Sequence, residues 1–130
     1  EALVRLTSVT GDMDIQEKAW TVAEYAAGRA AKQGYGQIGI LTACELARAP
    51  HKLVLVENPA DHRFVPVANR YPDPRRIDIV LHVGDAAGVS LPGDVLPSME
   101  KPGAYLCTGQ TCLPVIADAG MLEKTLKARP

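Results

Sequence analysis

The sequence predicts an α/β fold: an N-terminal helical hairpin followed by a small mostly parallel sheet with flanking helices. Apolar residues recur at helical spacing through the first fifty residues, and Pro50 closes that pattern. Beyond Pro50, residues 53–56 form a short continuous apolar run that is typical of a strand buried on both faces, and residues 77–83 predict a second strand. The segment between these strands can hold a crossover helix, which indicates a parallel βαβ unit. We therefore expect a helical hairpin over residues 1–50 and a small α/β domain over residues 51–130.

The first unit is expected to begin with the end of one helix and to continue with two antiparallel helices. After a Thr-Gly-Asp turn at residues 10–12, Asp14 offers an N-cap and Glu17 completes a capping box. Gly34 is a natural stop for that helix, and a second helix is expected over residues 37–49. The expected inward positions are Ile15, Ala19, Val22, Ala23, Ala26 and Ala30 in the longer helix, and Ile40, Leu41, Cys44 and Ala47 in the second.

The second unit is expected to open with a strand, a helix and a strand. Residues 53–56 and 77–83 are rich in Val, Ile and Leu and predict the two strands. Asn58-Pro59 favours the start of a helix, since proline is well tolerated at the first helical position. Residues 60–71 are therefore expected to form the crossover helix, although Pro66 interrupts the pattern.

The last part of the chain predicts a loop, a third strand and a final helix. Residues 84–102 contain several glycines and prolines with little periodicity, which is typical of a loop. Residues 104–107 predict a strand. Asp118 is expected to cap a last helix, whose apolar positions are Met121, Leu122 and Leu126.

Cys107 and Cys112 form the constellation most suggestive of chemistry, with a Thr-Gly-Gln-Thr turn between them. If this turn joins two strands, the cysteines are cross-strand neighbours at about 4.5–5.5 Å, within disulfide range. A reversible dithiol is one interpretation, two part-buried thiols used as small apolar residues are a second, and a metal site is a third. The spacing is not Cys-x-x-Cys, and no helix begins directly after it to lower a thiol pKa.

Other candidate ligands are scattered along the sequence. Cys44, His51, His62 and His82 are not at zinc-finger spacing from one another, so we expect no metal and no cofactor. Cys44 lies on the apolar side of its predicted helix and is expected in the core. His82 is expected on the less buried face of its strand or at the strand end.

Three further features have plain structural interpretations. Residues 84–88 follow a strand as a phosphate loop does, but they lack both glycine-rich nucleotide motifs. Trp20 and Tyr25 are expected to pack against a partner helix. No spacing pairs the candidate acid–base carboxylates, which are expected on the solvated surface: Glu17, Glu24, Asp61 and Asp78.

Composition narrows the classes of partner. The net charge is −1 and Lys and Arg do not form a patch, which argues against nucleic acid and anionic membrane as partners. The hydrophobic share of 47% is enough to form a core, but no apolar run has the length of a membrane span. Three cysteines, an odd and low number, favour a reducing compartment, and we expect the protein to be cytoplasmic.

The end of the chain resembles one protein family. The residues that carry the resemblance are Gly103-Ala104-Tyr105-Leu106-Cys107, followed by Cys112, Pro114, Asp118, Leu122 and Leu126. This string resembles the C-terminal end of the spermatogenesis-associated, thioredoxin-domain-containing proteins. The resemblance implies that the N-terminal hairpin belongs to the tail of a six-hairpin (α/α) toroid. It also implies a longer parent protein, and an opening at Glu1 within a periodic pattern agrees with a cut from such a chain.

The resemblance implies a non-catalytic C-terminal segment, whose partners are the parent's thioredoxin-like and toroid domains. We expect no enzymatic activity from this segment alone, and self-association through apolar helix faces. One alternative is a thiol–disulfide redox module in which Cys107 and Cys112 exchange electrons with the thioredoxin-like domain. Another alternative is a small-ligand binding module, which uses the loop at residues 84–102 and has a pocket at the carboxyl ends of the strands.

Overall fold

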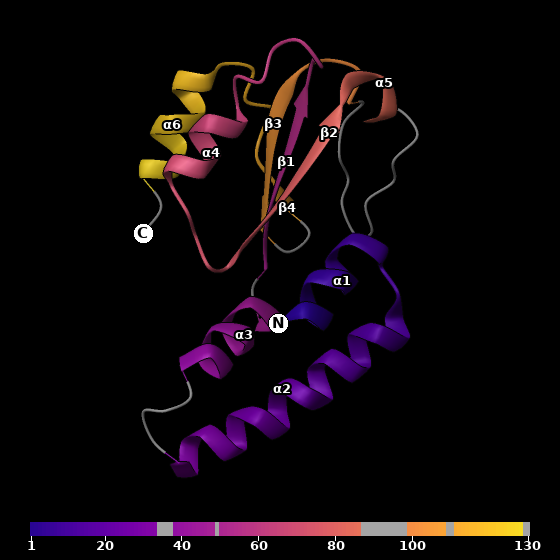
Figure 1. Cartoon of the computed structure of the whole chain (residues 1–130), viewed down its shortest axis with the longest axis vertical. Coiled ribbons are helices and arrows are strands. Elements are labelled where there is room, and N and C mark those ends of the chain that lie inside the picture. The colour runs from indigo at the N-terminus through magenta and orange to yellow at the C-terminus, as the bar shows by residue number, and fades with distance from the viewer. Residues whose placement is uncertain (34–37, 49, 87–98, 109–110, 129–130) are drawn as a thin grey trace.

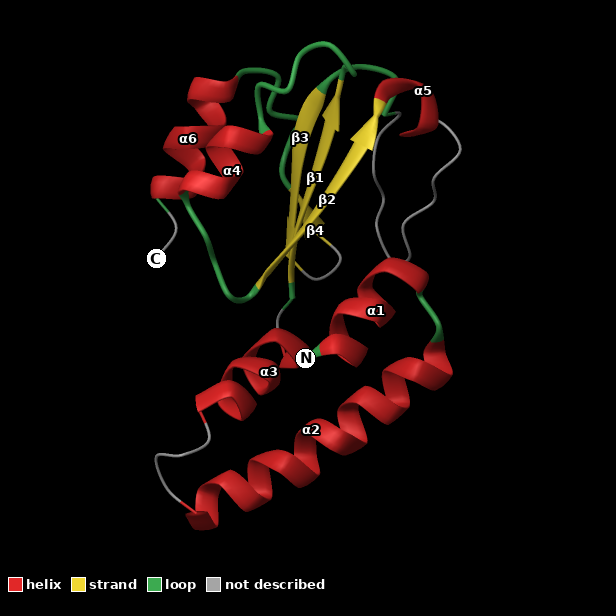
Figure 2. Cartoon of the chain, in the orientation of Figure 1, coloured by secondary structure: helices red, strands yellow, loops and turns green. Residues whose placement is uncertain are grey.

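The computed structural model describes residues 1–33, 38–48, 50–86, 99–108 and 111–128. Helices flank one four-stranded sheet, which confirms the α/β class (Figures 1 and 2). The elements in order are α1 (Ala2–Thr10), α2 (Met13–Gln33), α3 (Ile38–Arg48), β1 (His51–Glu57), α4 (Val65–Arg70), β2 (Arg76–His82), α5 (Val83–Ala86), β3 (Gly103–Thr108), β4 (Thr111–Cys112) and α6 (Ala119–Lys127).

The sheet is mixed rather than mostly parallel, with strand order β2-β1-β3-β4. β1 and β2 are parallel, and α4 lies in the connection between them, as the predicted βαβ unit requires. β3 instead runs antiparallel to β1, and β4 antiparallel to β3. The tight β3–β4 hairpin explains the direction of β4, because a short turn can join only antiparallel strands. β1 therefore lies in the middle of the sheet and has a strand on both sides.

Alternating side chains of β1 supply two cores, as expected for a strand buried on both faces. Leu53 and Leu55 face α4 and α6, where they pack with Phe64, Leu106 and Leu122. On the opposite face, the buried residues are Val54, Val56, Met99 and Tyr105. In Figure 1, α4 and α6 lie together beside the sheet, and α1–α3 lie at the end where β1 and β2 begin.

The N-terminal helices meet the sheet at the start of β2. Val4, Ala19 and Leu46, one from each helix, form a buried cluster with Ile77 of β2. Gly11 ends α1 with φ 67°, a left-handed conformation that favours glycine. The unit therefore comprises three helices, of which α2 and α3 form the predicted hairpin.

Three details of the helix predictions were wrong. Asp12, not Asp14, caps α2, because its side chain accepts from the backbone N–H groups of Asp14 and Ile15. The inward face of α3 is centred on Leu46, which is fully buried, whereas Leu41 is 56% exposed. In α2, Val22 is likewise exposed. The predicted stop at Gly34 lies outside the described residues.

The crossover helix is shorter than predicted. α4 begins at Val65 rather than near residue 60, and Pro66 lies in its first turn, where a missing N–H costs nothing. Asp118 caps α6 as predicted, accepting from the N–H of Met121 at 2.9 Å. Val83–Ala86 form a helical turn, α5, and residues 87–98 of the predicted loop lie outside the described residues. No helix in the described ranges has the length and apolarity that a membrane crossing needs.

Candidate functional site

Cys107 and Cys112 are joined by a disulfide across the β3–β4 hairpin. They are directly paired in the sheet, as expected if the turn joins two strands. Cys107 is 1% exposed, whereas Cys112 is only part-buried, so the two residues differ in exposure. The chain then continues beside β3, where Leu113 donates to the carbonyl of Leu106 at 2.9 Å. The structure thus brings together the two cysteines that the sequence singled out.

On the side of β3 opposite Cys112, the residue paired with Cys107 is Lys52 of β1. It is paired with Cys107 in the β1–β3 register, and paired residues point to the same face of a sheet. Lys52 is largely buried, at 8% exposed. A nearby cation favours a thiolate over a thiol. The sequence could not identify Lys52, because its role depends on the register of strands that are about fifty residues apart.

Among the remaining candidate ligands, Cys44 and His51 lie apart from the others, whereas the rings of His62 and His82 are in contact. Cys44 is the free cysteine of the described ranges, and its sulfur lies 3.5 Å from the carbonyl oxygen of Ala23 in the helical unit. His51 pairs with Asp73 at the start of β1, whereas His82 ends β2. Within the described ranges, no three His, Cys, Asp or Glu side chains could hold a metal ion together.

A buried carboxylate makes hydrogen bonds at the C-terminal ends of β1 and β2. Glu57 is fully buried, and its Oε1 accepts from the N–H groups of Phe64 at 2.6 Å and Val65 at 2.9 Å. Its Oε2 lies 2.9 Å from Nδ1 of His62. Glu57 therefore supplies the acceptor that the first turn of α4 needs. The ring of His82 lies edge-on to that of His62 at 6.1 Å, and its buried Nδ1 has no hydrogen-bond partner among the described residues.

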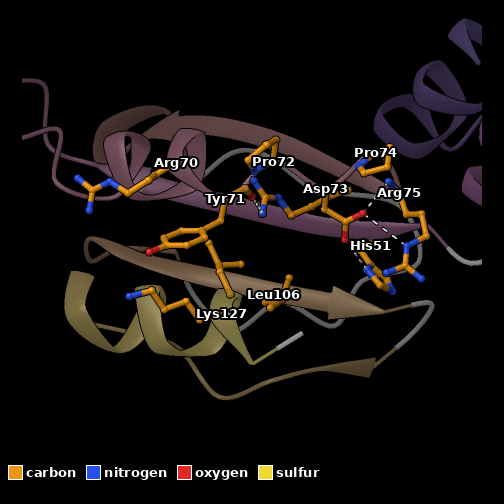
Figure 3. A pocket seen from close by; sticks show the side chains of 11 residues that line it. His51, Arg70, Tyr71, Pro72, Asp73, Pro74, Arg75, Leu106 and Lys127 are labelled. Carbon is orange, nitrogen blue, oxygen red and sulfur yellow. Dashed lines mark hydrogen bonds and ion pairs between the residues drawn. The ribbon is translucent and has the colours of Figure 1, made fainter. Parts of the chain in front are cut away.

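A cleft of about 480 Å³ lies at the opposite end of these strands, beside the N-terminal residues of β1 and β2 (Figure 3). This is the other end of the strands from the pocket predicted for a ligand-binding module. Leu106 and Leu126 contribute its apolar surface. The cleft is lined by His51, Arg70, Tyr71, Pro72, Asp73, Pro74, Arg75, Arg76, Leu106, Leu126 and Lys127.

Two carboxylates, Asp73 and Glu123, form ion pairs with basic side chains around the cleft. Burial raises the pKa of Asp73, but the N–H and guanidinium of Arg75 and the His51 ring outweigh burial and keep that pKa below its ordinary value. The hydrogen bond from the Tyr71 hydroxyl, at 2.7 Å, lowers the pKa of Glu123, and Lys127 lowers it further. Tyr71 and Glu123 in turn raise the pKa of Lys127. Both carboxylates are therefore ionised at neutral pH.

Most of the other residues considered from the sequence do not belong to a site in the described part of the chain. Glu17 and Glu24 are exposed on α2, and Asp61 pairs with Arg63 at the surface. Asp78 is exposed, as expected, and it also pairs with the buried guanidinium of Arg76 at 2.5 Å. Gly84 and Asp85 lie in α5, and Gly88 lies outside the described residues. Trp20 and Tyr25, expected to pack against a partner helix, are 42% and 67% exposed.

The fold and the hairpin define an α/β chain with a cystine at the edge of its sheet. No protein-family model matches the chain, and no curated protein is significantly similar to it.

Proposed function

We propose that the chain is a thiol–disulfide redox module that uses Cys107 and Cys112. The observation that carries this proposal is the disulfide between them, which closes a two-stranded hairpin and includes one part-buried cysteine, Cys112. In the cytoplasm, the compartment that the cysteine count favours, disulfides are usually transient and catalytic or redox-sensing. A cystine in such a chain is therefore more than a structural link.

The difference in exposure between Cys112 and Cys107 assigns the roles of attacking and resolving thiol. In the reduced protein, the Cys112 thiolate attacks one sulfur of a partner disulfide, and the other partner sulfur leaves as a thiolate and takes up a proton. The Cys107 thiolate then attacks Cys112, which restores the Cys107–Cys112 disulfide and releases the second partner sulfur, which is also protonated. Two electrons and two protons pass to the partner. Lys52 favours the thiolate of Cys107, which is the resolving group.

The partner follows from the family resemblance. We propose that the chain is the C-terminal part of a longer thioredoxin-domain and toroid protein, whose thioredoxin-like domain exchanges electrons with the hairpin. The α1–α3 unit would then continue the helical toroid.

A non-catalytic role is the second candidate, and the shortness of β4 favours it. β4 has two residues, both paired with β3, and the disulfide adds a covalent link to this short strand. In this role the disulfide fixes the edge of the sheet, and the segment helps to frame the cavity of the parent protein.

A redox titration of the whole chain separates these candidates. Thiols are labelled after equilibration in buffers of defined potential, and Cys107 and Cys112 are mapped by mass. A redox module is expected to titrate between roughly −270 and −120 mV, the range of known exchange proteins. A potential below about −300 mV, typical of structural disulfides, would support the non-catalytic role instead.

Trapping with a small disulfide tests the assigned roles. In Cys107→Ser, Cys112 is expected to form a stable mixed disulfide with glutathione disulfide, because no resolving thiol remains. In Cys112→Ser, the buried Cys107 is expected to react far more slowly. Cys44→Ser is the matched control and is expected to behave as the wild type, since Cys44 lies in the helical unit.

A further inference from the structure

The cleft at the amino ends of β1 and β2 is not used by the redox proposal. Leu106 lines it, and the next residue, Cys107, points to the opposite face of the sheet. The cleft lies on the face covered by α4 and α6, whereas Lys52 and Cys107 lie on the other face. A ligand in the cleft therefore does not contact the disulfide.

The size and apolar surface of the cleft suit a small organic molecule. Its volume of about 480 Å³ falls within the usual range of ligand pockets, roughly 300–1,000 Å³. Pro72, Pro74 and the ring of Tyr71 line the cleft, together with the small exposed parts of Leu106 and Leu126, which are 1% and 8% exposed. A ligand that fits this surface has an apolar body of modest size.

Cations outnumber carboxylates around the cleft. Glu123 is shared by Arg70 at 3.7 Å and Lys127 at 3.1 Å. Asp73 likewise serves both Arg75 and His51, and Asp78 holds Arg76. With His51 neutral, these ion pairs leave one positive charge in excess. The side chains of Arg70 and Lys127 are 61% and 58% exposed, so both can turn toward a bound anion.

We propose that this cleft binds a small organic carboxylate. The apolar body of the ligand lies over Leu106 and Leu126, and its carboxylate is held by Lys127 and Arg70 beside the Tyr71 hydroxyl. One negative charge matches the single excess positive charge, which favours a carboxylate over a doubly charged phosphate. The planar guanidinium of Arg70 adds geometric selectivity, since it can donate two parallel hydrogen bonds to a carboxylate.

Nuclear magnetic resonance titrations of the whole chain test this assignment with four probes. 3-Phenylpropionate is expected to shift the amide signals of the non-proline residues in 70–76 and of residues 126–127 in a saturable way. Its neutral counterpart 3-phenylpropanol and the small anion acetate are each expected to bind at least tenfold more weakly. Inorganic phosphate binding as tightly as 3-phenylpropionate would overturn the choice of a carboxylate. Absence of saturable shifts with 3-phenylpropionate would overturn the site itself.

A pair of variants on α6 provides the control. Lys127→Gln is expected to weaken 3-phenylpropionate binding about three- to fivefold, the effect of one exposed charge pair. Lys124→Gln removes the same charge from an exposed position of α6 that does not line the cleft, and is expected to leave binding unchanged. Equal weakening in both variants would show that net charge alone attracts the ligand, and the proposal would fail. Because the disulfide is not involved, this outcome is independent of the redox titration.

Discussion

At the scale of single residues, Glu57 shows how one buried carboxylate replaces a missing helix cap. Phe64 is the N-cap residue of α4, and its apolar side chain cannot accept a hydrogen bond. Glu57 reaches this end from the last position of β1 and accepts from two of the backbone N–H groups. One side chain thus joins the end of a strand to the start of the crossover helix.

We predict that Glu57→Ala destabilises the protein by about 2–4 kcal/mol, because it leaves two buried N–H groups without an acceptor. Glu57→Gln keeps the Oε1 acceptor and is expected to cost only about 1 kcal/mol. Urea unfolding curves measure both changes. Glu45→Gln, on the exposed side of α3, is the control and is expected to change little. Equal losses for Ala and Gln at position 57 would mean that the negative charge, not the acceptor, matters.

The neighbouring histidines show where residue-level prediction from sequence stops. His82 lies at the end of its strand, one of the two places expected for it. Its contact with His62, however, depends on the parallel register that aligns Glu57 with His82. Register is a property of the paired strands, so neither histidine alone indicates the other.

At the scale of elements, α4 and α6 are connected at their ends by side chains around Glu123. Tyr71, directly after α4, donates to this carboxylate on α6, and Arg70 and Lys127 flank it. The Tyr71–Glu123 contact spans 52 positions in the sequence, so it contributes to the fold only after both helices have packed.

Acid is expected to weaken this connection. The pKa values of Glu123 and Asp73 are lowered in the folded protein, so both carboxylates stabilise it above their ordinary pKa values of 4.5 and 3.8. That stabilisation is lost as the pH falls through the lowered values. Thermal melting between pH 6 and pH 2.5 is expected to show a smaller drop for Glu123→Gln than for the wild type. Parallel curves for the two proteins would contradict the assignment.

The elements that the sequence predicted best are those with strong local signals. The apolar run at residues 53–56 correctly predicted β1, and Asp118 correctly predicted the start of α6. The direction of β3 was missed because a hairpin partner of two residues carries almost no periodic signal. The cleft was missed for another reason: its lining comes from five elements and a loop that meet only in the folded chain.

At the scale of the whole molecule, the helical unit leaves many apolar side chains in solvent. They come from all three helices, and a soluble domain rarely exposes so many together. These side chains are Leu3, Leu6, Val9, Met13, Trp20, Val22, Tyr25, Ile38 and Leu41.

We expect the isolated chain to self-associate through this surface. Sedimentation velocity at rising concentration is expected to show a growing average mass for the wild type and a smaller increase for Ile38→Lys. Met121→Lys changes a comparably exposed residue on α6 and serves as the control. A clean monomer at high concentration would contradict the expectation.

The central position of β1 has a consequence for biosynthesis. β1 gains its parallel neighbour soon after it leaves the ribosome, but its antiparallel neighbour begins only at Gly103, 46 residues after Glu57. At about 5–20 residues per second, that interval lasts roughly 2–9 seconds. During this time the nascent chain carries an open hydrogen-bonding edge on its most apolar strand. Aggregation of the protein is therefore expected to depend on translation speed between β2 and β3, where slow codons would prolong the exposure.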